Sequence, residues 1–289
     1  MTTIHGFLLG ILQGIAEFLP ISSSGHLIIA QKLFGLEDVP LLFDIFLHLA
    51  TLAAVCIFFR HEIWELLKCL GRWISRKQTK TINYKKEEMD ILCNNEQQGH
   101  NTIIAVIVAT IVTGIIGIIT NYFIDDLPVK FICAGFIVTA ALLILSAIKQ
   151  KSASYVEKTS NLETTKKGIS IPQAMLIGLM QGLGTLPGVS RSGSTIAGAT
   201  FCNIDRNTAG SFSFILSIPA ILGAFVLDLK DLAKVSATIN VLSIITGCIT
   251  AFVVGYMALS VLMKIIKKGK LQRFAAYLIP AGILGLIFL

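Results

Sequence analysis

Residues 13–25 read QGIAEFLPISSSG, and residues 181–193 read QGLGTLPGVSRSG. The two stretches share Gln-Gly, Leu-Pro and Ser-x-Ser-Gly if one residue is dropped before the proline of the second stretch and one is added after it. Each lies in the middle of an otherwise apolar segment, at 6–36 and at 171–202. Such a break disfavours a continuous lipid-facing helix, because the freed backbone groups need partners. Each segment is therefore predicted to form a helix–loop–helix hairpin that enters the membrane and returns.

Six further apolar segments are long enough to cross a bilayer, which takes about 20 residues. They are 41–59, 103–123, 131–148, 209–227, 239–262 and 274–289. The chain is 54% hydrophobic and only 14% charged, with a mean hydropathy of +0.77. A soluble domain is about 25% charged. These figures exclude a soluble enzyme, a disordered protein and a secreted disulfide scaffold. They predict an all-α polytopic membrane protein with six transmembrane helices and two re-entrant hairpins.

The net charge of +7 reflects the orientation of the chain rather than binding to nucleic acid. Basic residues concentrate in three polar connections, which the positive-inside rule places in the cytoplasm. They are Arg60, Lys68, Arg72, Arg76, Lys77, Lys80, Lys85 and Lys86, then Lys149, Lys151, Lys158, Lys166 and Lys167, then Lys264, Lys267, Lys268, Lys270 and Arg273. The other connections carry Glu37, Asp38, Asp125, Asp126, Asp228 and Asp231, and are predicted to lie outside.

The two hairpins divide the chain into an internal repeat. Their motifs are offset by 168 residues, and each hairpin is followed by three spans. An odd number of crossings gives the two halves opposite orientations in the membrane, so the broken helices are expected to meet near the midplane. We predict a first repeat at 1–150, a cytoplasmic linker at 151–170 and a second repeat at 171–289. Within the first repeat, 61–76 is predicted to be an interfacial amphipathic helix, followed by a polar loop to residue 100.

The second hairpin has the composition of a phosphate site. Arg191 stands among hydroxyls and glycines, and no acidic residue lies in its own segment. A guanidinium provides a fixed fork of donors for an oxyanion, and Gly188 and Gly193 let backbone N–H groups approach. A helix that starts after residues 190–193 would add its positive dipole end. The hydroxyls of this hairpin belong to Ser190, Ser192, Ser194 and Thr195.

The first hairpin carries Glu17 and His26, nine residues apart on either side of its turn. Ionisable residues inside a membrane are costly and mark functional sites. A carboxylate, an imidazole and a serine between them can activate a hydroxyl and protonate a leaving oxygen. We therefore expect Glu17 and His26 to face each other. We interpret His48 as structural, like the remaining histidines, although its i,i+4 pairing with Asp44 inside a span could support the site.

At these residues the chain resembles the undecaprenyl-diphosphatase family, whose members are also called bacitracin-resistance proteins. The resemblance rests on Q-x-x-x-EFLPISSSGH at 13–26 and on PGVSRSGST at 187–195. It extends over nearly the whole chain through the hydropathy pattern. The family allows Glu or Gln where this chain has Gln13, so a second carboxylate is absent here.

The resemblance implies a membrane enzyme that removes a phosphate from undecaprenyl diphosphate, the lipid carrier of bacterial cell-wall synthesis. It implies catalytic roles for Glu17, Ser23, His26 and Arg191, and a nucleophile that is Ser23, His26 or a water molecule. Substrate contacts are expected from Gln13, Ser22, Ser24, Ser190, Ser192 and Thr195.

The resemblance also implies a divalent cation, Mg²⁺ or Ca²⁺. With Glu17 as its tentative protein ligand, the cation would be held largely by substrate oxygens and water. The expected partners are a polyprenyl diphosphate and the bilayer, with no nucleic acid, and a homodimer is possible. The expected location is the bacterial plasma membrane, with the site open to the extracytoplasmic side.

The alternative function is a polyprenyl-lipid flippase or secondary transporter, because inverted repeats with broken helices are typical of alternating access. The features that favour catalysis are Ser23 and His26 beside Glu17, which transport does not need.

Overall fold

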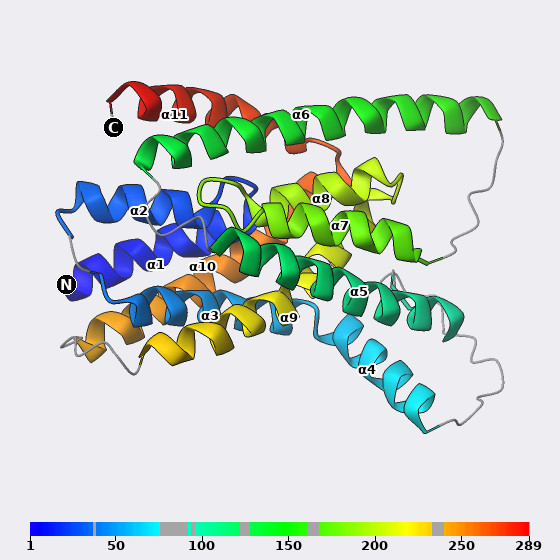
Figure 1. Ribbon diagram of the computed structural model, residues 1–289, viewed down its shortest axis with the longest axis horizontal. Coiled ribbons are helices and arrows are strands. Elements are labelled where there is room, and N and C mark those ends of the chain that lie inside the picture. Colours follow the sequence, from blue (N-terminus) through cyan, green and yellow to red (C-terminus); the bar gives the residue numbers. More distant parts are fainter. Residues whose placement is uncertain are drawn as a thin grey trace.

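The computed structural model describes residues 1–36, 39–75, 92–93, 96–121, 128–160, 168–232 and 240–288. These ranges contain helices and no strand, which confirms the predicted all-α class (Figure 1). The elements are α1 (Thr3–Phe18), α2 (Ser23–Leu33), α3 (Leu41–Phe58), α4 (Arg60–Ile74), α5 (Glu96–Asn121), α6 (Val129–Ser160), α7 (Ile171–Leu183), α8 (Arg191–Phe201), α9 (Arg206–Leu232), α10 (Val241–Lys267), the 3₁₀ turn η1 (Leu271–Phe274) and α11 (Ala275–Phe288).

Among the described residues, five helical segments are long and apolar enough to cross a membrane. They are α5, α6, α9, α10 and the continuous η1–α11 segment. α3 supplies a sixth when taken together with α4, from which it is bent by 77°. Each predicted span therefore has a helix, and the chain is a multi-pass membrane protein. The largest boundary differences are in α5, which begins at Glu96 inside the predicted loop, and in α6, which continues to Ser160 through the first part of the predicted linker. α9 and α10 also continue beyond their predicted ends, to Leu232 and Lys267.

The two predicted hairpins are pairs of short helices with a break between them. α1 ends at Phe18 and α2 begins at Ser23, while α7 ends at Leu183 and α8 begins at Arg191. The second break contains Gly188, whose φ of +86° and tight packing against the backbone of Ile132 leave no room for a Cβ atom. In Figure 1 the α1–α2 hairpin opens toward the end of the molecule that holds both termini, and α7–α8 opens toward the other end.

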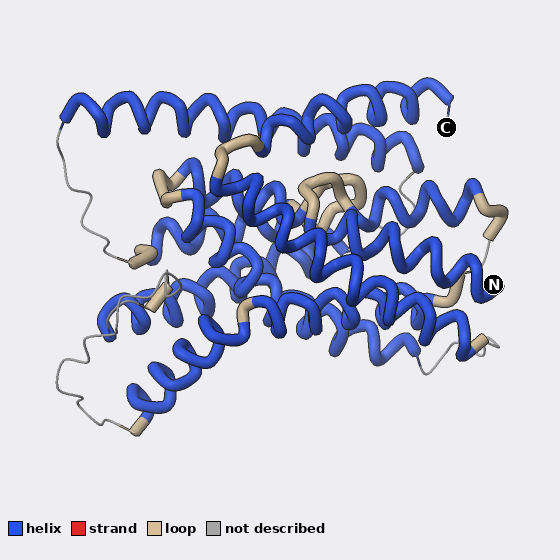
Figure 2. The backbone as a smooth tube through the Cα atoms, turned by 180° about the vertical axis from the view of Figure 1, so that it is seen from behind, coloured by secondary structure: helices blue, strands red, loops and turns tan. Residues whose placement is uncertain are grey.

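The first helix of each hairpin packs closely on a long helix through small residues. Gly10 of α1 lies against the backbone of Gly247 of α10. Gly178 of α7 lies in the same way against Ala109 of α5. Close approach through small residues is how helices associate where lipid removes the hydrophobic driving force. Both pairs run side by side in Figures 1 and 2.

These contacts are related by an exchange of the two halves. α1 and α5 of the first half correspond to α7 and α10 of the second half. The contact of α1 with α10 therefore corresponds to the contact of α7 with α5. Two other contacts, α6 with α11 and α3 with α9, each join one helix to its counterpart. Such a pattern is what an inverted repeat would give. The division at 1–150 and 171–289 remains a prediction, because residues 161–167 of the linker lie outside the described residues.

The predicted interfacial helix is α4, which leaves the bundle at the 77° bend after α3 (Figure 1). Its outer face exposes Trp64 and Leu67, while Leu66 and Cys69 are buried against the protein and Trp73 stacks on His100 of α5. The ammonium of Lys68 lies 5.6 Å from the ring centroid of Trp64. Aromatic and basic groups on one exposed face fit the boundary between lipid and water. The placement of α4 at the membrane surface stays a prediction. Residues 76–91 of the following loop lie outside the described residues.

Candidate active site

Glu17, in the last turn of α1, is the centre of a polar cluster. It is only 6% exposed, and both carboxylate oxygens have partners. Ser23 Oγ donates a hydrogen bond to Oε2 over 2.6 Å, and Gln13 Nε2 donates to the same oxygen over 3.1 Å. Arg191 forms an ion pair with Oε1. His48 Nε2 lies 3.6 Å from Oε2. A buried carboxylate therefore has donors from three helices, α1, α2 and α8, and a histidine of a fourth, α3, close by.

Arg191 brings the second hairpin to this cluster. It is the first residue of α8, so its side chain starts where the backbone N–H groups of a helix N-terminus are free. A second link joins the hairpins directly, because Ser192 Oγ donates to the backbone carbonyl of Phe18 over 3.0 Å. The breaks of the two hairpins thus lie against each other, which the sequence predicted from the repeat.

Ser22 and Ser190 occupy matching places at the starts of α2 and α8. The Oγ of Ser22 accepts from Gly25 N over 3.4 Å, and the Oγ of Ser190 accepts from Gly193 N over 3.2 Å. Both are N-caps, and both are buried. Ser22 also has a φ of +71°, which is uncommon for a residue with a side chain and is found at functional sites. Their structural role is to start the two short helices at the site.

The other predicted substrate-binding hydroxyls also have protein partners. Ser24 Oγ lies 3.5 Å from Ser22 Oγ, and Ser192 Oγ lies 3.2 Å from Ser190 Oγ. Thr195 Oγ1 donates to the carbonyl of Arg191 over 2.6 Å. These contacts place the hydroxyls at the two breaks, and their binding to a substrate remains a prediction.

Three buried polar atoms of the two hairpins have no hydrogen-bond partner among the described residues. They are Gln13 Oε1, Arg191 Nη1 and Ser194 Oγ. Buried polar atoms are nearly always satisfied, so each exception needs an explanation. An acceptor on one hairpin and two donors on the other are what a polar ligand between the hairpins would use.

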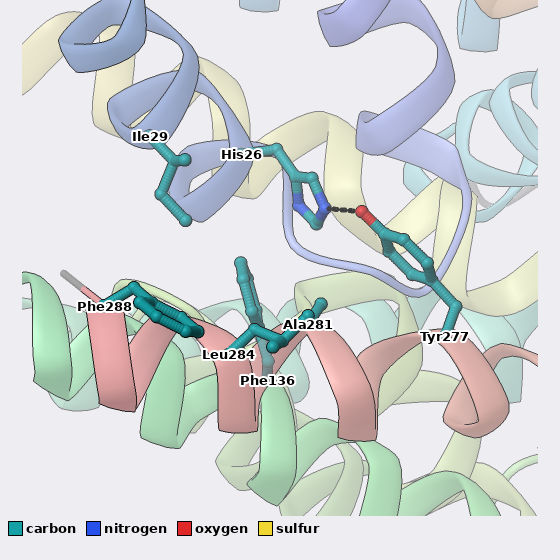
Figure 3. Close-up of a pocket in the computed structure, with 8 residues that line it drawn as sticks. His26, Ile29, Phe136, Tyr277, Ala281, Leu284 and Phe288 are labelled. Atoms are coloured by element: carbon teal, nitrogen blue, oxygen red, sulfur yellow. Dashed lines mark hydrogen bonds between the residues drawn. The ribbon is translucent and has the colours of Figure 1, made fainter.

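His26 lies in a different place from the one expected. The described contacts do not join it to Glu17. Its Nδ1 lies 2.8 Å from the backbone carbonyl of Ser22, and its Nε2 lies 2.7 Å from the hydroxyl of Tyr277 on α11 (Figure 3). A carbonyl only accepts, so Nδ1 carries a proton, and in the neutral ring Nε2 accepts from Tyr277. The bond to the Ser22 carbonyl orients the ring so that Nε2 meets Tyr277.

His48 of α3 lies beside Glu17 instead, which corrects the interpretation of this histidine as structural. Its Nδ1 donates to the carbonyl of Asp44 over 2.8 Å, which leaves Nε2 directed at the Glu17 carboxylate. The Asp44 carboxylate accepts from Gln31 of α2 over 3.1 and 3.3 Å. The signal available in the sequence was the i,i+4 pair of Asp44 and His48 inside an apolar span. Only the packing of α3 on α1 shows that it reaches the site.

The described residues contain no group of three His, Cys, Asp or Glu side chains that could hold a metal ion. The donors available at the centre are the carboxylate of Glu17 and the unpartnered Oε1 of Gln13. Mg²⁺ is commonly bound by one or two protein oxygens together with phosphate oxygens and water. The donor set therefore fits a cation that arrives with a phosphorylated substrate, rather than one held by the protein alone.

Known proteins match this chain over nearly its whole length. The family model of the bacitracin resistance protein BacA matches residues 6–284. An undecaprenyl-diphosphatase of Treponema denticola is 46% identical over 284 residues, which are 98% of this chain and 96% of that protein. Proteins of the same name from Desulforapulum autotrophicum and Methanosphaera stadtmanae are 36% identical over 292 residues and 38% identical over 287 residues. They cover 99% and 98% of this chain, and 98% and 97% of their own lengths.

Proposed function

The chain belongs to the bacitracin resistance protein family, and from this membership and its site we infer how it acts as an undecaprenyl-diphosphatase. It is a membrane enzyme that hydrolyses undecaprenyl diphosphate to undecaprenyl phosphate and inorganic phosphate, which recycles the lipid carrier of cell-wall synthesis. The observation that carries the assignment of roles is the Glu17 carboxylate, which joins the Ser23 hydroxyl of one hairpin to the Arg191 guanidinium of the other.

Arg191 binds the diphosphate in this proposal. Its Nη1 is buried beside the N-terminus of α8 and has no partner among the described residues, so it can donate to a phosphate oxygen. Charge-assisted bonds from a guanidinium and from a helix N-terminus favour an oxyanion, and they strengthen as charge moves onto oxygens in the transition state. Ser194 Oγ is a further donor on the same helix.

Ser23 is the nucleophile that the geometry favours. Its Oγ is 2.6 Å from Glu17 Oε2, which is the distance of a serine activated by a base. Glu17 takes the hydroxyl proton as Oγ attacks the terminal phosphorus. The bond to the bridging oxygen breaks, and the proton passes to the departing undecaprenyl phosphate. Water, deprotonated by Glu17, then attacks the phosphoserine, which releases inorganic phosphate and restores the hydroxyl.

The alternative nucleophiles are His26 and a water molecule. His26 lies in the same short helix as Ser23, but its Nε2 accepts a hydrogen bond from the Tyr277 hydroxyl. The ring would have to leave that contact to reach phosphorus. Rapid quenching during turnover separates the three routes. A phosphorylated peptide containing Ser23 supports the serine route, an acid-labile phosphohistidine at position 26 supports the imidazole route, and no phosphorylated protein supports direct attack by water.

A divalent cation, Mg²⁺ or Ca²⁺, is part of the proposal. The carboxylate of Glu17 and Oε1 of Gln13 would hold it together with oxygens of the diphosphate. When bound, it would neutralise charge on the diphosphate.

We place the enzyme in the bacterial plasma membrane, with its site reached from the extracytoplasmic side. The α1–α2 hairpin, which carries Glu17 and Ser23, opens toward the end of the molecule opposite the end of α10 (Figure 1). The last turn of α10 carries Lys264 and Lys267, Lys268 follows it, and the positive-inside rule places such a cluster in the cytoplasm. The acidic pairs at 37–38 and 125–126, which supported this orientation in the sequence, lie outside the described residues.

The test is phosphate release from undecaprenyl diphosphate by purified protein. Glu17→Ala and Arg191→Ala are expected to lower kcat/KM by about 100-fold or more, the scale of losing one group that acts in the transition state. Glu65→Ala and Arg60→Ala remove the same charges from α4, away from the site, and should keep wild-type activity. A wild-type protein that releases no phosphate but moves the lipid between leaflets would overturn the proposal.

A further inference from the structure

A groove of about 280 Å³ lies beside the candidate active site, between α2, α6 and α11. One end is polar and is formed by His26 and Tyr277 (Figure 3). The remaining lining is apolar, and its residues are Ile29, Phe136, Ala281, Leu284, Gly285 and Phe288. The floor is fixed, because the buried ring of Phe136 packs on the His26 ring with 4.8 Å between centroids.

The chemistry of the lining favours a hydrocarbon occupant. The His26 ring and the Tyr277 hydroxyl are hydrogen-bonded to each other, and the second ring nitrogen of His26 is hydrogen-bonded to the Ser22 carbonyl. Neither imidazole nitrogen is therefore free for a polar ligand in this arrangement. The opposite end is formed by Leu284 and Phe288, which are 54% and 77% exposed on a membrane helix and so face lipid. The groove is thus open on the side of α11 that faces away from the bundle.

One end of the groove lies next to the site along α2. His26 lies three residues after Ser23 in α2, and Ser23 is bonded to Glu17. From this end the lining follows α11 from Tyr277 to Phe288, a length of about 16 Å at the rise of an α-helix. A chain attached to a diphosphate between the hairpins can enter the groove at His26 and leave it in lipid.

We propose that this groove binds the first isoprene units of the polyprenyl chain of the substrate, those nearest the diphosphate. The proposal rests on the proposed function, because it takes the substrate to be a polyprenyl diphosphate. Close van der Waals contact of these units with Phe136, Ala281 and Leu284 provides the affinity, because lipid already keeps the prenyl chain out of water. The groove then makes the enzyme prefer a long prenyl chain to a short one.

Filling the groove tests this directly. Ala281→Trp places a large side chain in the lining, and Ile283→Trp places the same side chain on the exposed side of α11, outside the groove. We expect Ala281→Trp to raise the KM for undecaprenyl diphosphate by about tenfold or more. Its kcat/KM for the diphosphate of a single five-carbon prenyl unit, which does not extend along the groove, should stay within twofold of wild type. Ile283→Trp should leave both unchanged.

Unmodified protein provides a second measurement, which does not depend on the folding of a variant. A prenyl diphosphate with a photoreactive group in its second isoprene unit is bound and irradiated, and the labelled peptides are identified. Labels in 23–33, 129–160 and 271–288, which are the helices that line the groove, support the proposal. Labels confined to other helices overturn it, and so does an Ala281→Trp protein that handles both substrates like wild type or loses both equally. If wild-type protein releases no phosphate from either substrate, the proposed function fails, while the cross-links still report where the chain binds.

Discussion

At the scale of single residues, the chemistry depends on a carboxylate that is almost completely buried. Glu17 is stabilised by the guanidinium of Arg191 and by hydrogen bonds from Ser23 and Gln13. A buried charge is costly unless it is paired, and removing one partner exposes that cost. The same arrangement keeps the Ser23 hydroxyl aligned on the base before substrate binds, because its partner oxygen is fixed by the other groups.

His48 is predicted to assist Glu17. Its Nε2 is 3.6 Å from the carboxylate, and its Nδ1 is held by the Asp44 carbonyl. Replacing it with alanine removes a polar neighbour that orients the carboxylate toward Ser23. We expect His48→Ala to lower kcat/KM for undecaprenyl diphosphate about tenfold, the equivalent of roughly 1.4 kcal/mol. Phosphate release measures the effect.

The matched control for this prediction is His61→Ala on the exposed face of α4. It should retain wild-type kinetics. If His48→Ala also retains them, the contact between His48 and Glu17 has no role in the reaction.

At the scale of elements, the position of the site depends on how closely α1 approaches α10. A Cβ atom on Gly10 would lie 2.5 Å from the carbonyl oxygen of Gly247, which is backbone and cannot move aside without shifting a helix. We expect Gly10→Ala to destabilise the protein by about 1–3 kcal/mol, the range for overpacking. The measurement is a lower thermal unfolding temperature in detergent, accompanied by reduced activity because Glu17 lies two turns further along α1.

Gly114→Ala is the control for the same change in another helix. A Cβ atom at this position of α5 meets no other atom within 4 Å. Alanine also has a higher helix propensity than glycine, so the unfolding temperature should stay the same or rise slightly. Equal destabilisation by both substitutions would show that the loss comes from the helices themselves and not from the contact between α1 and α10.

The second half of α4 packs on α5 through two buried thiols, Cys69 and Cys93, which both lie against Gly99 of α5. Burial, and then the neighbouring Cys69 thiol, raise the pKa of Cys93 to about 12. A thiol reacts as its thiolate, so the native protein should resist alkylation at Cys93 at neutral pH. The folded pKa lies above the unfolded one, so this packing is stable at neutral pH and weakens as the pH rises from about 9 toward 12.

The measurement is the rate of maleimide reaction at Cys93, read from the labelled peptide of a variant that keeps only Cys69 and Cys93, in native detergent solution and after unfolding in SDS. The native rate should keep rising with pH above 9, while the unfolded rate levels off near its ordinary pKa. A variant with Ser75→Cys at the exposed end of α4 reports the reactivity of an open thiol. A native Cys93 that reacts as fast as this control would contradict the packing.

At the scale of the whole molecule, the two hairpins enter from opposite ends, and their breaks meet inside the bundle (Figures 1 and 2). The long helices around them keep lipid away from the charged groups. This arrangement satisfies two opposing demands, because a membrane excludes charge and a diphosphate needs it.

The orientation of the molecule is tested with single cysteines in a protein that lacks its own six. Lys32, at the end of α2, and Lys268, just after α10, are exposed at opposite ends of the bundle. An impermeant maleimide added to intact cells should label Lys32→Cys and not Lys268→Cys, because the basic cluster after α10 belongs in the cytoplasm. Labels in the reverse pattern would show that the site opens to the cytoplasm. Permeabilised cells, in which both positions react, are the control.

Much of the architecture could be predicted from the sequence because it depends on local properties. The six spans follow from runs of apolar residues, and the two hairpins follow from Pro, Gly and Ser inside such runs. Glu17 and Arg191 stood out as charged residues in apolar surroundings, and the structure brings them together. The ends of α5 and α6 could not be placed, because polar residues that continue a helix beyond the membrane leave no break in the sequence.

The sequence by itself therefore determined the class of the protein, its spans, its broken hairpins and the two charged residues, Glu17 and Arg191, that the structure pairs. The tertiary structure decided which histidine meets that pair. His48 and His26 are both intramembrane histidines near polar residues, but only the packing of α3 on α1 directs one to Glu17, while α11 engages the other through Tyr277, 251 residues away. Such choices depend on contacts between distant helices, and hydropathy and spacing along the chain do not encode them.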